Sequence, residues 1–316
     1  MRYNPLGNTD LKVSAVSFGT APLGDMFGAV DETVATAAVH RALDAGITFF
    51  DSSPYYGNGL AEQRLGTALR GHREDVVIGT KAGRYGNDEF DFTPKRLRES
   101  VHHSLELLQT DYVDILQLHD IEFVDLDGVF ADTYAELARL RDEGKCRYIG
   151  MTGYPMETLR RAVAETDLDV VLSYAHYTLL NTRLADELAP LCQERGVGLI
   201  NAAAVALGLL TPAGSRIKVP AGQRIVDAAR RAAEVCAQGG ADIAFLANQF
   251  SIQCSGAATT VVGTTKARHL DAAVAAESAP IDEDLLAAVL MVTADVRDLS
   301  WSSGLPENNG GDTCSA

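Results

Sequence analysis

Hydrophobic and polar positions follow two alternating patterns along this chain. Short apolar or β-branched runs, typical of buried strands, are separated by longer segments whose apolar residues recur at helical spacing. At Gly46, Gly144 and Gly196 a helix-like segment ends at glycine and a strand-like run follows at once. The pattern predicts eight strands: one that ends at Gly19, and the runs 47–50, 76–79, 113–118, 146–151, 170–173, 197–200 and 259–262.

Local signals define several boundaries. Alternation of apolar residues after a turn-forming stretch predicts a hairpin over residues 2–18. A helix over 94–109 is expected because Thr93 can cap it and its leucines share one face. Pro190 predicts a kink or break in the helix over 182–195.

Eight short strands that alternate with amphipathic helices fit a (β/α)8 TIM barrel with an N-terminal β-hairpin. The alternative is an open, doubly wound sheet, which usually carries a G-x-G-x-x-G fingerprint after a strand. Here residues 196–198 precede a strand, and residues 57–59 lack the third glycine. We therefore expect one barrel domain over residues 1–306. Residues 307–316 are polar and rich in glycine, so we expect a flexible tail there.

Composition narrows the classes of function. Of the 316 residues, 47% are apolar and 22% are charged, which suits a globular protein with a large core. The net charge of −16 disfavours binding to nucleic acid or to an anionic membrane surface. No apolar run approaches the roughly 20 residues that span a bilayer, and the N-terminus lacks a signal-peptide core, so we expect a cytoplasmic protein. Five cysteines without C-x-x-C spacing argue against a disulfide framework or a zinc site, and we expect no metal.

Polar side chains follow three consecutive predicted strands. Asp51 and Tyr56 come after the second strand, Lys81 after the third and His119 after the fourth. Each residue alone has an ordinary structural interpretation, such as a turn cap or a packing aromatic. A parallel barrel gathers the carboxyl ends of its strands at one mouth, so these four side chains should meet. An acid, a phenol, an amine and an imidazole together favour hydride transfer with Tyr56 as the proton carrier.

The tyrosine needs a neighbour that stabilises its anion, because a free phenol has a pKa near 10. A lysine about 4 Å away, at an effective dielectric constant near 20, supplies about 4 kcal/mol, or about three pK units. We therefore predict that Lys81 brings the pKa of Tyr56 close to the working pH. Asp51 would hold Lys81 charged and oriented, and His119 would hydrogen-bond the reacting oxygen.

These residues also resemble the catalytic tetrad of the aldo-keto reductases. The resemblance covers nearly the whole chain, from Leu6 onward, with Tyr56 five residues after Asp51 and with Lys81 and His119 at the ends of matching strands. Further stretches are similar to the group of L-galactose and L-fucose (D-threo-aldose) 1-dehydrogenases. These stretches are 18–24, 53–57, 81–85, 119–123 and 298–301.

The resemblance implies oxidation of the anomeric carbon of an aldose to a lactone with NAD(P)+ as the hydride acceptor. Tyr56 would accept the proton of the C1 hydroxyl in that direction. The partner would be a small-molecule aldose of the L-galactose or L-fucose type. Three alternatives stay open: an NADPH-dependent general aldehyde reductase, a dehydrogenase of pyridoxal-type alcohols, and a nucleotide-binding regulatory barrel similar to the potassium-channel β-subunits.

The resemblance also implies a set of cofactor-binding positions. Where NADP-preferring relatives have a lysine, a serine and an arginine, this chain has Gly263, Thr264 and His269, which favours NAD. Lys266 and Arg268 lie close enough in sequence to compensate, so NADP stays possible. Where many members of the family have an aromatic residue followed by Ser-Pro-Leu, this chain has Ala202-Ala203-Ala204-Val205. Where they have a Ser-Asn pair, it has Thr152-Gly153. The full set of predicted cofactor contacts is Gly19, Thr20, Asp51, Thr152, Ser173, Val205, Gly263, Thr264, Lys266, Arg268 and His269.

Four residues are candidates for contact with the sugar. Tyr55 and His119 belong to the predicted mouth, and His176 follows the sixth strand. Trp301, the only tryptophan, lies in a C-terminal segment that could cover the mouth and offer an apolar platform. The sequence leaves the physiological aldose and the oligomeric state open.

Overall fold

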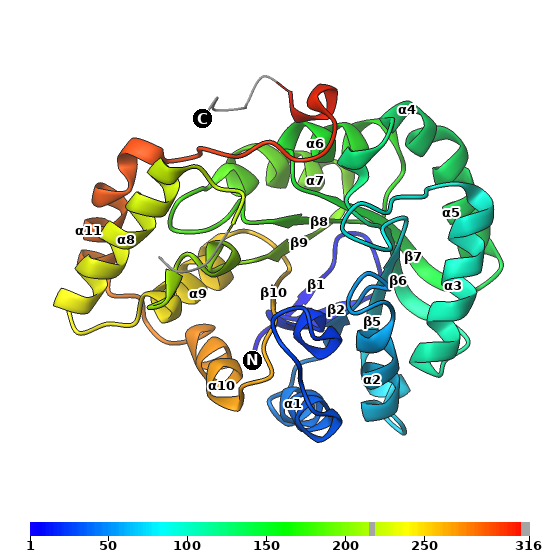
Figure 1. Cartoon of the computed structure of the whole chain (residues 1–316), viewed down its shortest axis with the longest axis horizontal. Helices are drawn as coiled ribbons and strands as arrows, with labels where there is room; N and C mark the ends of the chain where they lie inside the picture. The colour runs from blue at the N-terminus through cyan, green and yellow to red at the C-terminus, as the bar shows by residue number, and fades with distance from the viewer. Residues whose placement is uncertain (215–218, 311–316) are drawn as a thin grey trace.

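The structure is a computed structural model, and it describes residues 1–214 and 219–310. Within these residues eight parallel strands close into a barrel in the order β10-β3-β4-β5-β6-β7-β8-β9 (Figure 1). The predicted TIM-barrel fold is confirmed. The strands are β3 (Val16–Gly19), β4 (Phe49–Asp51), β5 (Val77–Ala82), β6 (Val113–Leu118), β7 (Cys146–Gly153), β8 (Val170–Tyr174), β9 (Gly198–Ala202) and β10 (Thr259–Val262).

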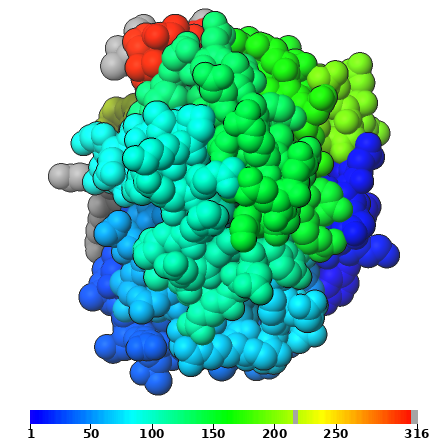
Figure 2. Space-filling model, turned by 90° about the vertical axis from the view of Figure 1, so that its right-hand side faces the viewer, coloured from blue at the N-terminus to red at the C-terminus, as the bar shows by residue number. Residues whose placement is uncertain are grey.

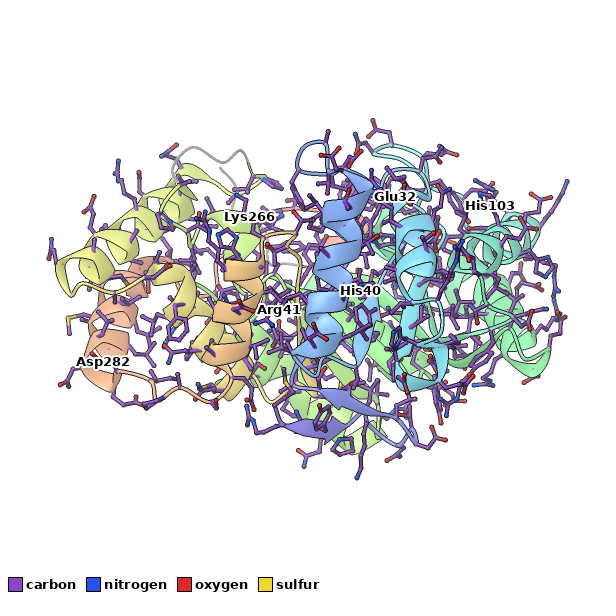
Figure 3. The ribbon with its side chains drawn as sticks, turned by 90° about the horizontal axis from the view of Figure 1, so that it is seen from below. Glu32, His40, Arg41, His103, Lys266 and Asp282 are labelled. Atoms are coloured by element: carbon purple, nitrogen blue, oxygen red, sulfur yellow. The ribbon has the colours of Figure 1, made fainter. Side chains whose placement is uncertain are left out.

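Helices surround the barrel (Figure 1). They are α1 (Glu32–Asp44), α2 (Leu60–Ala68), α3 (Pro94–Leu108), α4 (Leu126–Gly128), α5 (Tyr134–Asp142), α6 (Met156–Glu165), α7 (Ala189–Arg195), α8 (Gln223–Gln238), α9 (Ile243–Cys254), α10 (Ala267–Ala276) and α11 (Glu283–Val292). The first and last barrel helices are neighbours, as Figure 3 shows, and Arg41 of α1 pairs with Asp271 of α10 at 2.8 Å. Within the described ranges no helix combines the length and the apolar character needed to cross a bilayer.

One predicted helix boundary is confirmed. The side chain of Thr93 accepts a hydrogen bond from the backbone N–H of Arg96 and caps α3, as expected. The helix is not broken at Pro190, where a kink or break was predicted: a π-helical turn over Leu184–Leu188 runs directly into α7 at Ala189. Proline has no N–H to donate, so it suits the first turn of α7.

The predicted N-terminal hairpin is shorter than expected. Strands β1 (Tyr3–Pro5) and β2 (Lys12–Ser14) pair antiparallel, but the chain then leaves the hairpin at Ala15 and enters the barrel as β3. The hydroxyl of Ser14 donates to the carbonyl of Val16, which supports the change of direction. The hairpin closes the bottom of the barrel, where Leu6, Leu11 and Val13 pack against inward-facing residues of the strands.

Two strands extend further than their apolar runs predicted. Lys81 lies inside β5 and Thr152 lies inside β7, although both were expected after their strands. The ladder continues because backbone pairing does not depend on side-chain polarity, and Lys81 pairs with Gln117 of β6. The side chains of Lys81 and Thr152 therefore stand on strands rather than on loops.

The C-terminal segment is ordered beyond the predicted start of the tail. After α11 the chain crosses the end of the molecule near α6 and forms a short 3-10 turn over Pro306–Asn309 (Figure 1). The atoms of this C-terminal part lie at the top edge of the molecule in Figure 2. Asn308 is buried, and its amide donates to the backbone carbonyls of Glu122 and Val124. The expectation of a flexible tail from residue 307 is wrong for residues 307–309, and residues 311–316 lie outside the described part of the chain.

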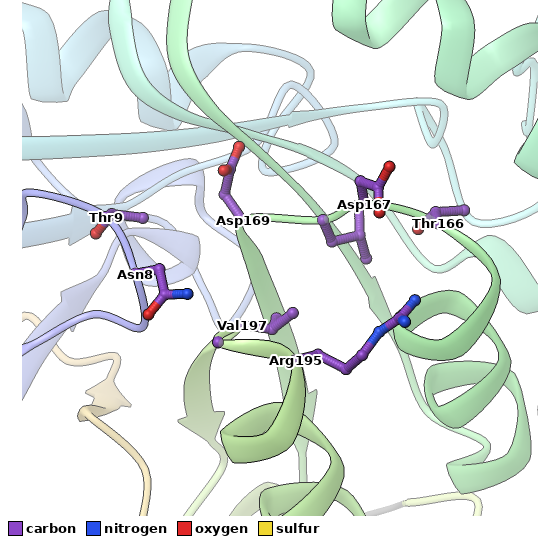
Figure 4. A pocket seen from close by; sticks show the side chains of 9 residues that line it. Asn8, Thr9, Thr166, Asp167, Asp169, Arg195 and Val197 are labelled. Carbon is purple, nitrogen blue, oxygen red and sulfur yellow. The ribbon is translucent and has the colours of Figure 1, made fainter.

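A small pocket of about 220 Å³ lies at the end of the barrel that the N-terminal hairpin closes (Figure 4). It is lined by the hairpin turn at Asn8 and Thr9 and by residues that precede β8 and β9, such as Asp169 and Arg195. These are the amino-terminal ends of the strands, whereas active sites of such barrels lie at the carboxyl ends.

Candidate active site

The four predicted catalytic residues come together at the carboxyl-terminal mouth of the barrel. Asp51 is the last residue of β4, Lys81 is near the end of β5, and His119 follows β6. Their residues are 3%, 2% and 5% exposed, so the polar groups lie in a nearly dry environment. Tyr56 completes the group, with its ring 5.8 Å from the His119 ring and nearly perpendicular to it.

Lys81 is the centre of this group. Its ammonium donates to Asp51 Oδ2 at 2.6 Å and to the backbone carbonyl of Ser52 at 2.8 Å, and it lies 5.1 Å from the centre of the Tyr56 ring. Burial by itself would lower the pKa of Lys81, but Asp51 and Tyr56 outweigh it and hold the pKa above its usual value. Lys81 therefore stays charged, as the sequence led us to expect.

The prediction for the tyrosine pKa is wrong. Burial raises the pKa of Tyr56 to about 12, and the nearby Lys81 charge lowers it too little to compensate. The negative charges of Asp51 and Asp120 add to the upward shift. Tyr56 is therefore protonated in this structure and can act as a proton donor.

His119 is held neutral. Burial lowers the pKa of His119 to about 3, and the positive charges of Lys81 and Arg84 act in the same direction, against Asp120. Its Nδ1 lies 2.9 Å from Ser53 Oγ. A neutral imidazole with one nitrogen occupied can use the other to donate a hydrogen bond to a reacting oxygen.

Sequence reasoning missed two buried polar residues beside the tetrad. Gln117 of β6 points into the barrel, and its amide nitrogen lies 3.4 Å from Asp51 Oδ1. The period of two along β6, with Ile115, Gln117 and His119 on one side, could have identified it. Glu62 of α2 accepts a hydrogen bond from the Thr80 hydroxyl behind Lys81, and no signal in the sequence indicates this contact.

Several predicted cofactor positions lie around the same mouth. Gly19 and Thr20 end β3, and the Thr20 hydroxyl donates to Ser52 Oγ at 2.8 Å. Gly263 and Thr264 follow β10 and lead into α10, whose first turn carries three further predicted positions. Those three are Lys266, Arg268 and His269.

The start of α10 has the chemistry of a phosphate site. Lys266, at the end of the helix in Figure 3, and Arg268 are exposed, and neither forms an ion pair with any residue that the structure describes. The Thr264 hydroxyl accepts the backbone N–H of Lys266. A ten-residue helix with cations at its N-terminus suits the phosphates of a dinucleotide.

Other predicted cofactor residues are engaged elsewhere. Ser173 is fully buried and pairs with His176 Nδ1 at 3.1 Å, while its neighbours Leu172 and Tyr174 line the barrel interior. Ser173 therefore lies on the outer side of β8, and the expectation that it binds the cofactor is wrong for this structure. The Thr152 hydroxyl bonds Asp120. Val205 is half-buried in the loop after β9.

The predicted substrate residues divide into two groups. Tyr55 lies at the mouth, 5.8 Å from His119 between ring centroids, and Trp301 is partly exposed and stacks on Tyr154 at 4.4 Å. His176 is fully buried and stacks on Tyr154 at 4.7 Å, so the prediction that it touches a sugar directly is wrong here. Tyr154 was missed, because local spacing cannot show that the C-terminal segment returns to residue 154.

The fold and the mouth define a class of protein. An eight-stranded parallel barrel that presents a buried lysine, a tyrosine, an aspartate and a neutral histidine at its carboxyl end has the layout of an enzyme active site with groups for acid–base chemistry. The model of the Aldo/keto reductase family matches residues 15–292, and the chain belongs to this family of oxidoreductases, which use NAD(P)H.

Individual relatives agree with this assignment. The chain is 42% identical over 313 residues to an L-galactose dehydrogenase of Arabidopsis thaliana, covering 96% of this chain and 98% of the relative. It is 33% identical over 289 residues to a D-threo-aldose 1-dehydrogenase of a Pseudomonas species, covering 82% and 88%. The holo form of an aldo-keto reductase from Bacillus halodurans superimposes with a TM-score of 0.77, at 27% identity over 98% of this chain and 99% of that one.

Proposed function

We propose that this protein oxidises the C1 hydroxyl of an aldose of the L-galactose or L-fucose type to the lactone, with transfer of the hydride to NAD+. The observation that carries the proposal is the position of the Lys81 ammonium, which bonds Asp51 and lies over the Tyr56 ring, beside a neutral His119. The L-galactose dehydrogenase relative, which aligns along nearly the whole chain, supports the choice of an aldose.

Each residue has a defined task in this reaction. Tyr56 first releases its own proton to solvent, and the ammonium of Lys81 stabilises the resulting phenolate. The phenolate then takes the proton of the C1 hydroxyl and returns to the neutral phenol. Asp51 keeps Lys81 charged and in place through the 2.6 Å contact. His119 donates a hydrogen bond to the C1 oxygen while the carbonyl of the lactone develops.

The raised pKa of Tyr56 makes proton acceptance the difficult part of this direction. The oxidised nicotinamide supplies the hydride acceptor and a positive charge, which favours the phenolate. Lys266 and Arg268, at the start of α10, are the groups suited to a 2′-phosphate when NADP binds instead. We expect NAD to be preferred over NADP because Gly263, Thr264 and His269 provide less positive charge than a lysine and an arginine would.

The test is the initial rate of NADH or NADPH formation, followed at 340 nm. L-galactose, L-fucose and D-arabinose are each offered with NAD+ and with NADP+, to wild type and to Tyr56→Phe. We expect turnover with NAD+ that is lost in the variant, since phenylalanine keeps the ring but removes the proton acceptor. A wild type that oxidises none of these sugars but reduces simple aldehydes with NADPH would replace the proposal with a general reductase.

A further inference from the structure

Beside the tetrad lies an ion pair that the chemistry above does not use. Arg84 follows the end of β5, three residues after Lys81, and Asp120 directly follows His119. Arg84 Nη1 donates to Asp120 Oδ2, and Arg84 Nε donates to the backbone carbonyl of Gly86. The arginine side chain is 17% exposed and that of the aspartate 5%, so the pair is largely withdrawn from water.

The arginine is fixed in one orientation by aromatic rings. Its guanidinium lies 4.1 Å from the centre of the Tyr55 ring and 5.3 Å from that of Phe90. Such stacking leaves the edge of the guanidinium free for hydrogen bonds. Among the described residues no acceptor bonds its Nη2, so the arginine keeps an unused donor.

The aspartate is fixed by its backbone and by a threonine. Asp120 has a left-handed conformation, with φ of 55°, which aspartate and asparagine tolerate better than most residues. Its N–H donates to Thr152 Oγ1 at 3.0 Å, and the Thr152 hydroxyl lies 3.3 Å from Oδ1. These contacts leave Oδ2 directed toward Arg84 and the mouth.

The position of this oxygen relative to the histidine is informative. Asp120 Oδ2 lies 3.7 Å from His119 Nε2, which is too far for a hydrogen bond of about 2.9 Å. No other group in the described residues bonds Nε2. The histidine nitrogen and the carboxylate oxygen therefore lie side by side, so that two neighbouring oxygens of one ligand can each bind one of them.

We propose that the Arg84–Asp120 pair binds the C2 hydroxyl of the aldose, while His119 and Tyr56 hold the C1 oxygen. The hydroxyl donates to Asp120 Oδ2 and accepts from Arg84, so both its proton and its lone pair are satisfied. A simple aldehyde has no such group and leaves a buried charge pair without its ligand. This inference rests on the proposed function and explains how the site selects sugars.

The test compares two sugars that differ in this one group. 2-Deoxy-D-ribose is D-arabinose without its C2 hydroxyl, and both can be offered with NAD+ to wild type, Asp120→Asn and Arg84→Met. Asparagine keeps the left-handed turn, and methionine keeps much of the packing on Tyr55. We expect wild type to favour D-arabinose in kcat/KM by about 10- to 100-fold, the value of a hydrogen bond to a charged group. Each variant should reduce that preference to within about threefold, mainly by losing activity on D-arabinose.

Asp25→Asn is the matched control, because Asp25 also has a left-handed backbone, with φ of 59°, and also pairs with an arginine, Arg64, at 2.8 Å. It should leave the sugar preference unchanged. A preference that survives in Asp120→Asn and Arg84→Met, or a loss that is equal for both sugars, would overturn the inference while the dehydrogenase function stands. A wild type that oxidises neither D-arabinose nor the other aldoses would overturn both.

Discussion

The hydroxyl oxygen of Ser53 lies 2.9 Å from Nδ1 of His119 and also accepts the backbone N–H of Tyr55 at 3.1 Å. The serine is fully buried, and within the described chain Nδ1 is the one acceptor in reach of its proton. A buried hydroxyl that donates to Nδ1 requires this nitrogen to be unprotonated. The proton of the neutral imidazole then lies on Nε2, the nitrogen beside Asp120.

Removal of the Ser53 hydroxyl should allow the His119 imidazole to populate both of its neutral tautomers. We expect Ser53→Ala to lower kcat about tenfold, because the imidazole then also populates the form that cannot donate from Nε2. The ¹³C and ¹⁵N NMR shifts of the His119 ring report the tautomer directly. Ser255→Ala is the control, since Ser255 is also buried and accepts the N–H of Ala257 two residues on. Unchanged His119 shifts, or an equal loss of kcat in the control, would contradict the assignment.

The buried carboxyl of Glu62 should give the protein a pH-dependent stability. Burial raises the pKa of Glu62 to about 7, against about 4.3 in an unfolded chain. Between these values the unfolded chain releases the proton and the folded chain keeps it, so the free energy of unfolding falls as the pH rises, by up to about 4 kcal/mol. Glu62→Gln cannot ionise and should lack this fall.

Urea unfolding at pH 5, 6, 7 and 8 measures the effect. The free energy of Glu62→Gln relative to wild type should rise with pH up to about 7 and then level off. Glu194→Gln on the exposed side of α7 should show a constant difference from wild type. A constant difference for Glu62→Gln as well would mean that this carboxyl does not titrate in the folded protein.

The sequence predicted the fold well because apolar periodicity determines which segments can pair. The ends of the strands were less certain, since a polar residue such as Lys81 can continue a backbone ladder while its side chain serves the mouth. The predicted pKa of Tyr56 was wrong because the prediction included the charge of Lys81 but not the free-energy cost of burying the phenolate. Burial depends on the packing of several strands and is not readable from the residues next to Tyr56 in sequence.

Contacts between distant segments were also beyond sequence reasoning. Tyr154 stacks on both His176 and Trp301, and this arrangement depends on where the C-terminal segment crosses the barrel. The roles of Arg84 and Asp120 depend in the same way on the meeting of two strand ends. Their neighbours Lys81 and His119 were identified because they lie at those ends, but spacing alone does not indicate which flanking side chains turn toward the site.

The cations at the start of α10 should contribute more to NADP than to NAD. If Lys266 and Arg268 provide the remaining attraction for a 2′-phosphate, the double variant Lys266→Ala/Arg268→Ala should lower kcat/KM for NADP+ about tenfold and for NAD+ less than about threefold. Lys95→Ala on α3 also removes an exposed charge and should change neither. Equal losses with the two cofactors would place the cations on a phosphate that both cofactors share.

The stack of Trp301 on Tyr154 should support the sugar ring. The two rings are 4.4 Å apart between centroids and nearly parallel. The backbone N–H of Trp301 donates to the Tyr154 hydroxyl at 3.4 Å. These contacts hold the partly exposed indole in one orientation. We expect Trp301→Ala to raise KM for D-arabinose about tenfold with little change in kcat, because an apolar platform contributes to binding rather than to proton or hydride transfer. Trp301→Phe keeps a ring on Tyr154 and should recover most of the affinity. If both variants keep the wild-type KM and only lower the melting temperature, Trp301 packs the C-terminal segment and does not contact the sugar.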